Sequence, residues 1–303
     1  MKPIAMGLDL MRATGLAGPL KTLAGALPRR WVAGMPAALL NRTWFSGLVA
    51  VDSLPGRRFT MVTDPTTVSL RDSAAASHGG EALALFARLV PGARTFLDIG
   101  ANTGVYSLIA GVNGVPHVHA FEPVPRIAAR LRENLSLNRL DRVRVHDCAV
   151  TSHAGTITLY VPAGEMPTEA STLHGFRPAA EPVTVAAVTL DEICAEQRIQ
   201  SVDLMKVDTE STEPEVFAGG ERTLERNLPT IICEVLHGMT EARLHERFDP
   251  LGYRYYWLTD RGAQPVRRIE GDPTWRFLNF ALVHPARQAA FERAAAALAA
   301  SLN

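Results

Sequence analysis

The strongest pattern along the chain is a series of short apolar runs separated by stretches with helical spacing, beginning near residue 95. Each run has the length of a buried strand, and several are followed by turn residues and then by apolar positions three and four apart. Such alternation of strand and helix is typical of a parallel α/β sheet. We predict the strands of this series at residues 95–99, 117–121, 143–150, 202–207 and 230–235.

The segment between the third and fourth of these strands does not follow the same rhythm. Residues 156–161 and 183–188 each alternate in polarity and flank a polar loop that contains Pro and Gly. We expect them to form two antiparallel strands, within an insertion over about residues 151–190 that is placed to cover a site.

The C-terminal part adds strand-like runs at 253–258 and 277–283 and an Ala-rich helix at 287–302. The sequence therefore predicts a mostly parallel, seven-stranded sheet whose last strand is antiparallel.

The N-terminal part has weaker periodicity. Residues 1 to about 50 read as short helices broken by Gly and Pro, and 59–70 as a small strand pair. Residues 81–89 have helical spacing and end at a Pro-Gly pair. We divide the chain into an N-terminal helical cap at 1–75 and one large α/β domain at 76–303.

Composition narrows the classes of function. The 303 residues are 47% apolar, and 31 basic residues balance 31 acidic ones, so no basic surplus is available to bind nucleic acid. Charged residues interrupt each apolar run of the first forty residues, and we expect neither a membrane-spanning helix nor a signal peptide. The three cysteines lie in apolar runs without a C-x-x-C pair, which favours core positions and a reducing, cytoplasmic location.

The clearest local motif is the loop that follows the first predicted strand. Asp98 ends the strand, and Gly100 and Gly104 follow in a D-x-G-x-x-x-G pattern before a helix. The next strand ends at Glu122, at the spacing where an acid meets ribose hydroxyls in nucleotide-binding units. The third glycine of the dinucleotide fingerprint is missing. An acid such as Asp98 suits the sulfonium and ammonium groups of S-adenosylmethionine, although a buried strand end and a helix cap would also explain it.

From this loop onward the chain resembles the FkbM-type methyltransferases. The likeness rests on ordered motifs: D-I-G-A-N-T-G from Asp98, F-E-P at 121–123, E-N-L-S-L-N at 133–138, A-V at 149–150, Gly155, T-L-D at 189–191, D-L-M-K-V-D-T-E at 203–210 with Glu213, and I-C-E-V at 232–235. The resemblance implies a Rossmann-like class I methyltransferase fold and transfer of a methyl group from S-adenosylmethionine to hydroxyl oxygens of sugars and other natural products.

The resemblance also assigns cofactor contacts. Asp98, Gly100, Asn102 and Gly104 would line the methionine end of the cofactor, and Glu122 would bind both ribose hydroxyls. Asp147, at the end of the third strand, would face the adenine amino group, or it is an exposed strand-end acid.

Two positions depart from the pattern of the family. Ser211 follows the second acid of K-x-D-x-E, where the family usually has glycine, and Arg139 replaces a glycine after Asn138. Serine tolerates positive φ poorly, so either this backbone lies in a common region or the geometry of the family's turn is not fully kept.

The ends of the last two parallel strands carry the candidate catalytic groups. Lys206, Asp208 and Glu210 alternate along an extended strand and so share one face. Glu213 follows them closely, and His237 lies just beyond the next strand, whose end supplies Glu234.

This concentration of carboxylates has several interpretations. A salt-bridge network around Lys206 would explain it. For methyl transfer, a base must remove the hydroxyl proton. We favour an acid between Asp208 and Glu213, oriented by Lys206, with His237 as the alternative. Asp208, Glu210 and Glu234 could instead hold a divalent cation, but spacing alone does not decide this, and we assign no metal.

The sequence thus predicts an S-adenosylmethionine-dependent O-methyltransferase acting on a small hydroxylated acceptor. A nicotinamide-dependent oxidoreductase and a non-catalytic cofactor-binding protein are the alternatives. We expect neither nucleic acid nor stable membrane insertion, and we assign no oligomeric state.

Overall fold

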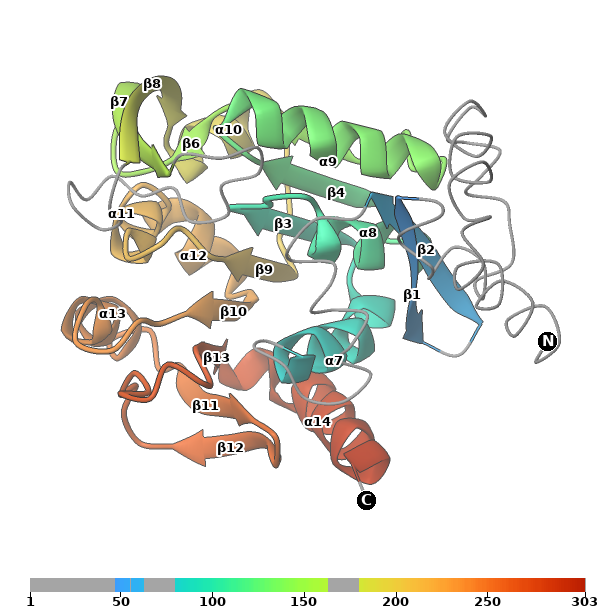
Figure 1. Cartoon of the computed structure of the whole chain (residues 1–303). Helices are drawn as coiled ribbons and strands as arrows, with labels where there is room; N and C mark the ends of the chain where they lie inside the picture. Colours follow the sequence, from blue (N-terminus) through green and yellow to red (C-terminus); the bar gives the residue numbers. More distant parts are fainter. Residues whose placement is uncertain (1–46, 55, 63–79, 163–179, 303) are drawn as a thin grey trace, which may run out of the picture.

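The computed structural model describes residues 47–54, 56–62, 80–162 and 180–302. The short helices predicted before residue 47 and the loop of the insertion lie outside these residues. An eight-stranded sheet forms the centre of the molecule, with the strand order β12-β11-β13-β10-β9-β3-β4-β5 (Figure 1).

The five predicted parallel strands are neighbours and form the larger part of this sheet. β3 (Thr95–Ile99) and β4 (His117–Phe121) have the predicted bounds. Parallel pairing joins β3 to both β4 and β9 (Leu204–Val207), and β9 to β10 (Thr230–Glu234). Every residue of β3 and β9 is buried, as expected for strands covered on both faces.

The other half of the sheet has one strand more than the sequence predicted. β13 (Asn279–Val283) is antiparallel to both β10 and β11 (Arg254–Thr259), as predicted for the last strand. β12 (Gly262–Val266) pairs with β11 at the edge of the sheet, which makes the sheet eight-stranded and the prediction of seven wrong. β12 contains Pro265 and is mostly half-buried or exposed, so it lacks the alternating apolar pattern of a typical strand.

The predicted strand at 143–150 is two strands in different sheets. β5 (Arg144–His146) ends the central sheet beside β4, whereas β6 (Ala149–Val150) pairs with β8 (Ala180–Val188). β8 is antiparallel to β7 (Gly155–Pro162), which confirms the predicted pair of the insertion. The chain therefore changes sheets between His146 and Ala149.

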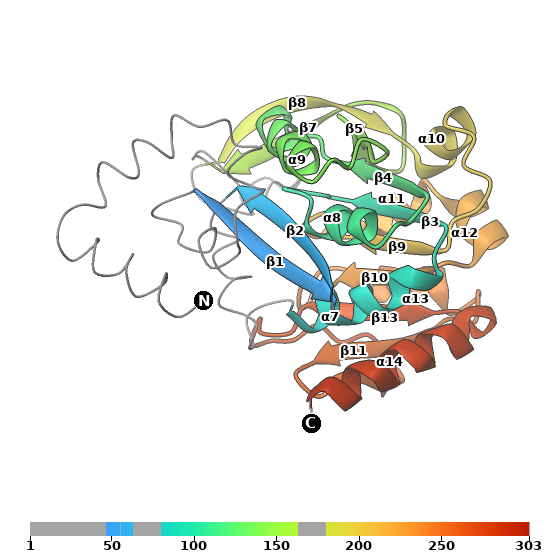
Figure 2. The ribbon, with the colours of Figure 1, turned by 90° about the vertical axis from the view of Figure 1, so that its right-hand side faces the viewer.

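Helices cover both faces of the central sheet, because alternate strand residues point to opposite sides (Figure 2). Phe96 and Leu204 pack with helices on one face, and Leu97 and Met205 with helices on the other. The first face carries α7 (Gly80–Leu89), α8 (Val105–Val112), α9 (Pro125–Leu137) and α14 (Gln288–Leu302). The second carries α10 (Leu190–Glu196), α11 (Glu213–Ala218), α12 (Glu221–Asn227) and α13 (Glu241–Phe248).

A separate antiparallel hairpin, β1 (Leu48–Leu54) and β2 (Arg57–Val62), lies beside α8 and α9. It begins earlier than the strand pair predicted at 59–70, so β1 occupies residues that include the end of the predicted short helices. The run L-V-A-V from Leu48 is apolar and partly β-branched, which favours a strand.

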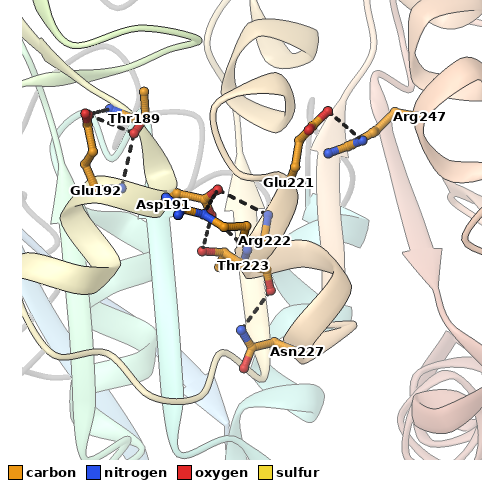
Figure 3. A network of polar contacts seen from close by, with 8 residues as sticks. All are labelled: Thr189, Asp191, Glu192, Glu221, Arg222, Thr223, Asn227 and Arg247. Atoms are coloured by element: carbon orange, nitrogen blue, oxygen red, sulfur yellow. Dashed lines mark hydrogen bonds and ion pairs between the residues drawn. The ribbon is translucent and has the colours of Figure 1, made fainter.

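Polar caps fix the start of α10 and join it to α12 (Figure 3). Thr189 and Glu192 form a reciprocal capping box at the start of α10. One carboxylate oxygen of Asp191 accepts hydrogen bonds from the backbone N–H and the hydroxyl of Thr223, and the other accepts from the backbone N–H of Arg222. Asp191, part of the T-L-D motif, therefore caps the first turn of α12.

All three cysteines are buried and free of disulfides, which confirms their predicted core positions. Among the described residues, no helix combines the length and the apolar character that crossing a membrane requires.

Candidate functional site

The loop after β3 makes its turn with left-handed backbone at three positions, Gly100 (φ 78°), Asn102 (φ 51°) and Gly104 (φ 95°). A Cβ at Gly100 would overlap the carbonyl oxygen of Asp208, and one at Gly104 would overlap the side chain of Leu131. Gly100 is thus required by a close backbone contact, whereas the sequence had suggested only room for a ligand; at Gly104 the neighbouring atom belongs to a side chain, and the left-handed backbone is what favours glycine. The contact at Gly100 brings the loop after β3 directly against the loop after β9.

Asp98 lies beneath this loop, with 1% of its surface exposed. Ser107 of α8 donates its hydroxyl to Asp98 Oδ2 at 2.6 Å. Burial raises the pKa of Asp98 to about 6, although the Ser107 hydrogen bond and the charge of Lys206 oppose this shift. When it is ionised, Asp98 therefore places a negative charge inside the protein, beneath the glycine loop.

Glu122 follows β4 and closes the loop from the other side. It is 5% exposed, and its two oxygens accept the backbone N–H groups of Asn102 and Val124, each at 2.9 Å. Burial raises the pKa of Glu122 to about 7 against the effect of these hydrogen bonds. The structure thus brings the predicted loop and the predicted acid together through a direct contact.

Asn134 was not singled out by the sequence as a site residue, although it belongs to the E-N-L-S-L-N motif. Its side chain on α9 is fully buried, donates to the carbonyl oxygen of Thr103 and accepts the N–H of Val62. Asn138, one turn later, makes paired hydrogen bonds with the backbone of Thr60. The two asparagines therefore fasten the hairpin to α9, and Asn134 also fastens it to the loop.

Asp147 lies immediately after β5, on the exposed side of the same edge. Both of its oxygens accept from the guanidinium of Arg132 at 2.8 Å, and its side chain is 55% exposed. The structure places Asp147 in a bidentate surface ion pair, one strand away from Glu122.

Lys206 is a buried cation beside the acids at the ends of β9 and β10. It is 2% exposed, and its ammonium contacts Asp208 Oδ2 at 2.9 Å and Asn279 Oδ1 at 3.1 Å. Burial alone lowers the pKa of Lys206, but the charge of Asp208 and its hydrogen bond to the ammonium act in the opposite direction, and the pKa is raised. The ammonium stays charged, and Asn279 is a second contact that the sequence did not suggest.

Carboxylates from two strand ends converge beside this ammonium. One oxygen from each of Asp208, Glu210 and Glu234 lies within 4.8 Å of the others. Burial and the charges of Asp208 and Glu210 raise the pKa of Glu234 well above its ordinary value, and Glu234 Oε2 is buried without a hydrogen-bond partner. This set of hard oxygen ligands could hold a divalent cation, or Glu234 can stay protonated and donate a hydrogen bond.

Glu213 points into the turn that follows Asp208. It is 1% exposed, and its Oε1 accepts the backbone N–H groups of Thr209 and Ser211. Burial raises the pKa of Glu213 to about 7. These contacts make Glu213 a residue that shapes the turn.

The backbone of the same turn shows which conformation Ser211 adopts at the position where the family usually has glycine. Glu210 and Ser211 have φ of 55° and 76°, so Ser211 keeps the left-handed backbone that a glycine would adopt more easily. Arg139, at the other departure from the family, has φ of 56°. Both positions therefore retain a glycine-like backbone conformation despite their side chains.

His237 is exposed and lies three residues beyond Glu234. Its Nδ1 is 2.7 Å from the carbonyl oxygen of Gly271. Because a carbonyl only accepts, Nδ1 carries the proton, and Nε2 of the neutral ring presents a lone pair. Oxygens of Asp208, Glu210 and Glu234 lie within 4.8 Å of one another, whereas no described contact joins His237 to Asp208 or Lys206.

The topology and the site define the class of protein. A mostly parallel sheet carries a glycine loop after β3, a buried acid after β4 and further acids after β9 and β10, as in a Rossmann-like class I methyltransferase. Residues 98–255, more than half of the chain, match the family model described as the methyltransferase FkbM domain. The chain belongs to this family.

Curated relatives of known name match parts of the chain. A 2-O-methyltransferase, NoeI, from Sinorhizobium fredii is 31% identical over 144 residues, which cover 43% of this chain and 58% of the relative. The 31-O-demethyl-FK506 methyltransferase FkbM from Streptomyces tacrolimicus is 31% identical over 183 residues, which cover 48% of this chain and 66% of the relative. The matched regions thus span less than two thirds of either relative.

Solved structures of methyltransferases also align with the chain, at low identity. A methyltransferase FkbM from Methylobacillus flagellatus aligns with a TM-score of 0.42 and 15% identity, over 63% of this chain and 43% of that chain. A SAM-dependent methyltransferase from Agrobacterium tumefaciens aligns with a TM-score of 0.44 and 14% identity, over 79% of this chain and 70% of that chain.

Proposed function

We propose that this chain transfers the methyl group of S-adenosylmethionine to a hydroxyl of a small molecule, a sugar or another natural product. The observation that carries the proposal is the family match over residues 98–255, which includes both the loop after Asp98 and the acidic ends of β9 and β10. The names of the two relatives, which both specify O-methyl transfer or a demethylated O-position, support a hydroxyl acceptor.

The charges of the site fit this cofactor. The carboxylates of Asp98, Glu122 and Glu234 are buried and have raised pKa values. The described positive charges and hydrogen bonds therefore do not fully offset the cost of burying a negative charge at these positions. S-adenosylmethionine brings a sulfonium and an ammonium group, which ionised acids stabilise. The cofactor also brings hydroxyl and amino hydrogen-bond donors to the remaining lone pairs of such acids.

We assign the cofactor contacts as follows. Gly100, Asn102 and Gly104 line the methionine end above the charge of Asp98. Glu122 takes the ribose hydroxyls, because each of its oxygens accepts one backbone N–H in the described contacts and has a further lone pair. Asp147, after the next strand, lies at the adenine edge, with Arg132 holding its carboxylate in place.

The sulfonium supplies an electrophilic methyl group, and the chain must align the acceptor oxygen and remove its proton. Asp208 is our candidate base, and the ammonium of Lys206 positions its carboxylate. Glu213 holds the turn that carries Asp208 and Glu210. His237, with an available Nε2, is the second candidate for the base.

Calorimetry with S-adenosylhomocysteine and methyl-transfer assays on a panel of hydroxylated saccharides and macrocycles test the proposal. Asp208→Asn should lower the rate constant by at least about a hundredfold if it removes the base, and His237→Ala should lower it less. Glu225→Gln, on the exposed surface of α12, is a control with the same loss of one charge. Failure to bind S-adenosylhomocysteine would refute the proposal, and wild-type rates in both site variants would refute the assignment of the base.

A further inference from the structure

A polar hollow lies at the opposite end of the central strands from the candidate site. Its volume is about 710 Å³, within the range of small-molecule pockets. β3 begins at this hollow with Thr95 and ends at the glycine loop, so the length of the strand separates the two regions by roughly 15 Å. We call it the basic hollow, after the side chains that line it: Arg94, Arg144, Arg198, Arg226, His117 and His119.

Neighbouring strands bring the residues at 94, 117, 119 and 144 together from distant parts of the chain. The N–H of His117 donates to the carbonyl oxygen of Arg94 at 3.0 Å, and His119 lies opposite Arg144 in the pairing of β4 with β5. Arg144 reaches the side chain of Gln197 at 3.5 Å, after α10. The sheet thus supplies one side of the lining, the loop after α10 supplies Arg198 and Ile199, and α12 supplies Arg226.

The charge of the basic hollow is one-sided. In the part of the chain that the structure describes, no carboxylate lines it, and none of its four guanidinium groups forms an ion pair. Asp203 lies behind Arg94, but its carboxylate already accepts the N–H groups of Arg94 and Thr95 and pairs with Arg287. In a chain with no net charge, four unpaired arginines around one hollow are a local excess.

The imidazole of His119 lies beside these arginines and does not add to their positive charge. It is 3% exposed, and burial lowers its pKa to about 4, with the charges of His146 and Arg144 acting in the same direction. His119 is therefore neutral at physiological pH. The positive charge of the hollow comes from the arginines, and Ile199 adds an apolar surface beside them.

We propose that the basic hollow binds a small molecule with two or more adjacent phosphate groups. Guanidinium groups bind phosphate oxygens through paired, charge-assisted hydrogen bonds, and several of them favour a polyanion over a single carboxylate. The ligand occupies a site separate from the methyl donor and acceptor. The proposal therefore does not rest on the proposed methyl transfer.

Calorimetry on the full chain, saturated with S-adenosylhomocysteine to fill the cofactor site, tests this with pyrophosphate, tripolyphosphate and inorganic phosphate. We expect pyrophosphate and tripolyphosphate to bind more tightly than phosphate. The double variant Arg144→Gln, Arg198→Asn should weaken pyrophosphate binding by about tenfold or more. Asparagine is chosen because Arg198 has φ of 55°, a conformation that asparagine tolerates.

Arg254→Gln removes one charge from an exposed strand start that does not line the hollow, and it should change the affinity by less than about twofold. Unchanged S-adenosylhomocysteine affinity in all variants, measured separately, shows that they are folded, and Arg198→Asn alone serves if the double variant does not fold. Three results would overturn the proposal: no pyrophosphate binding by the wild-type chain, equal affinity in the variants at Arg198 and at Arg254, or tighter binding of a single-stranded oligonucleotide of equal charge.

Discussion

Replacing Gly100 by alanine should disrupt the site far more than replacing Gly114, although both glycines have left-handed backbone, with φ of 78° and 84°. Alanine in this conformation costs about 1–2 kcal/mol at either position. A Cβ at Gly114 has no heavy atom within 4 Å, whereas one at Gly100 would overlap the carbonyl oxygen of Asp208 and lie 2.9 Å from its carbonyl carbon. Only Gly100→Ala therefore forces two backbone segments apart.

The kind of atom that a Cβ would meet sets the expected difference in stability between the two variants. Because the obstacle is backbone and cannot rotate away as a side chain would, we add an overpacking cost of about 1–3 kcal/mol at Gly100. Gly114→Ala should thus lower the free energy of unfolding by about 1–2 kcal/mol, and Gly100→Ala by about 2–5 kcal/mol. Separation of the loops after β3 and β9 should also weaken S-adenosylhomocysteine binding by at least about tenfold in Gly100→Ala alone.

Urea denaturation and calorimetry measure the two effects on the same samples. Equal stability losses in the two variants would show that the close approach of Gly100 to Asp208 does not constrain the fold. Wild-type cofactor affinity in a folded Gly100→Ala variant would show that the position of this loop does not matter for binding.

The turn after β9 and the charges of the candidate site can be tested in four more ways. Ser211→Gly should raise the free energy of unfolding by about 1 kcal/mol in urea denaturation, because φ of 76° suits glycine; a loss of stability would contradict this. Lys206→Met should lower it by about 3–5 kcal/mol, since buried carboxylates lose their counter-charge, and a loss below about 1 kcal/mol would show that they are protonated or solvated instead. S-adenosylmethionine affinity, measured by calorimetry, should rise as the pH increases through about 6 to 7, because Asp98 and Glu122 ionise there, and a flat affinity profile would exclude a role for their charges. Their raised pKa values also mean that the free chain loses stability as the pH rises from about 4, near the ordinary pKa of these acids, to about 6 to 7, with no further loss from these two groups at higher pH. Asp147→Asn should weaken S-adenosylhomocysteine binding only about twofold to fivefold, because Arg132 already satisfies both oxygens, and a loss as large as that in Glu122→Ala would make Asp147 a principal contact.

The sequence predicted the centre of the fold well, because buried parallel strands leave a clear signal. β3 and β4 have the predicted bounds, since each is a short apolar run that begins after a turn and ends at a glycine loop or a proline. The run at 143–150 was wrong as a single strand, because hydrophobic periodicity does not reveal that a chain moves from one sheet to another. β12 was missed for a related reason, since an edge strand buries too little to show a pattern.

The candidate site was predictable where the chemistry depends on residue type and strand ends. The loop after Asp98 and the acid at Glu122 could be placed together, because parallel strands end at the same edge of the sheet. The direction of a side chain was not predictable. Glu213 is an acid close to a strand end, as a catalytic base would be, yet its carboxylate accepts hydrogen bonds from the backbone of its own turn. Asn134 lies in a motif of the family but had no predicted role, and Asn279 gave no signal, because an amide acquires its role only from the neighbours that the tertiary fold supplies.

The contact between Gly100 and the backbone of Asp208 has a consequence for how the molecule folds. It joins two loops that are separated by the β4, β5 and insertion segments, so it is a non-local contact of the kind that forms slowly. While the chain emerges from the ribosome, the loop after β3 cannot reach its final shape until β9 has been synthesised and has docked beside β3. The ability to bind a cofactor should therefore arise late in folding, and the ligand should slow unfolding chiefly by holding these two strands together.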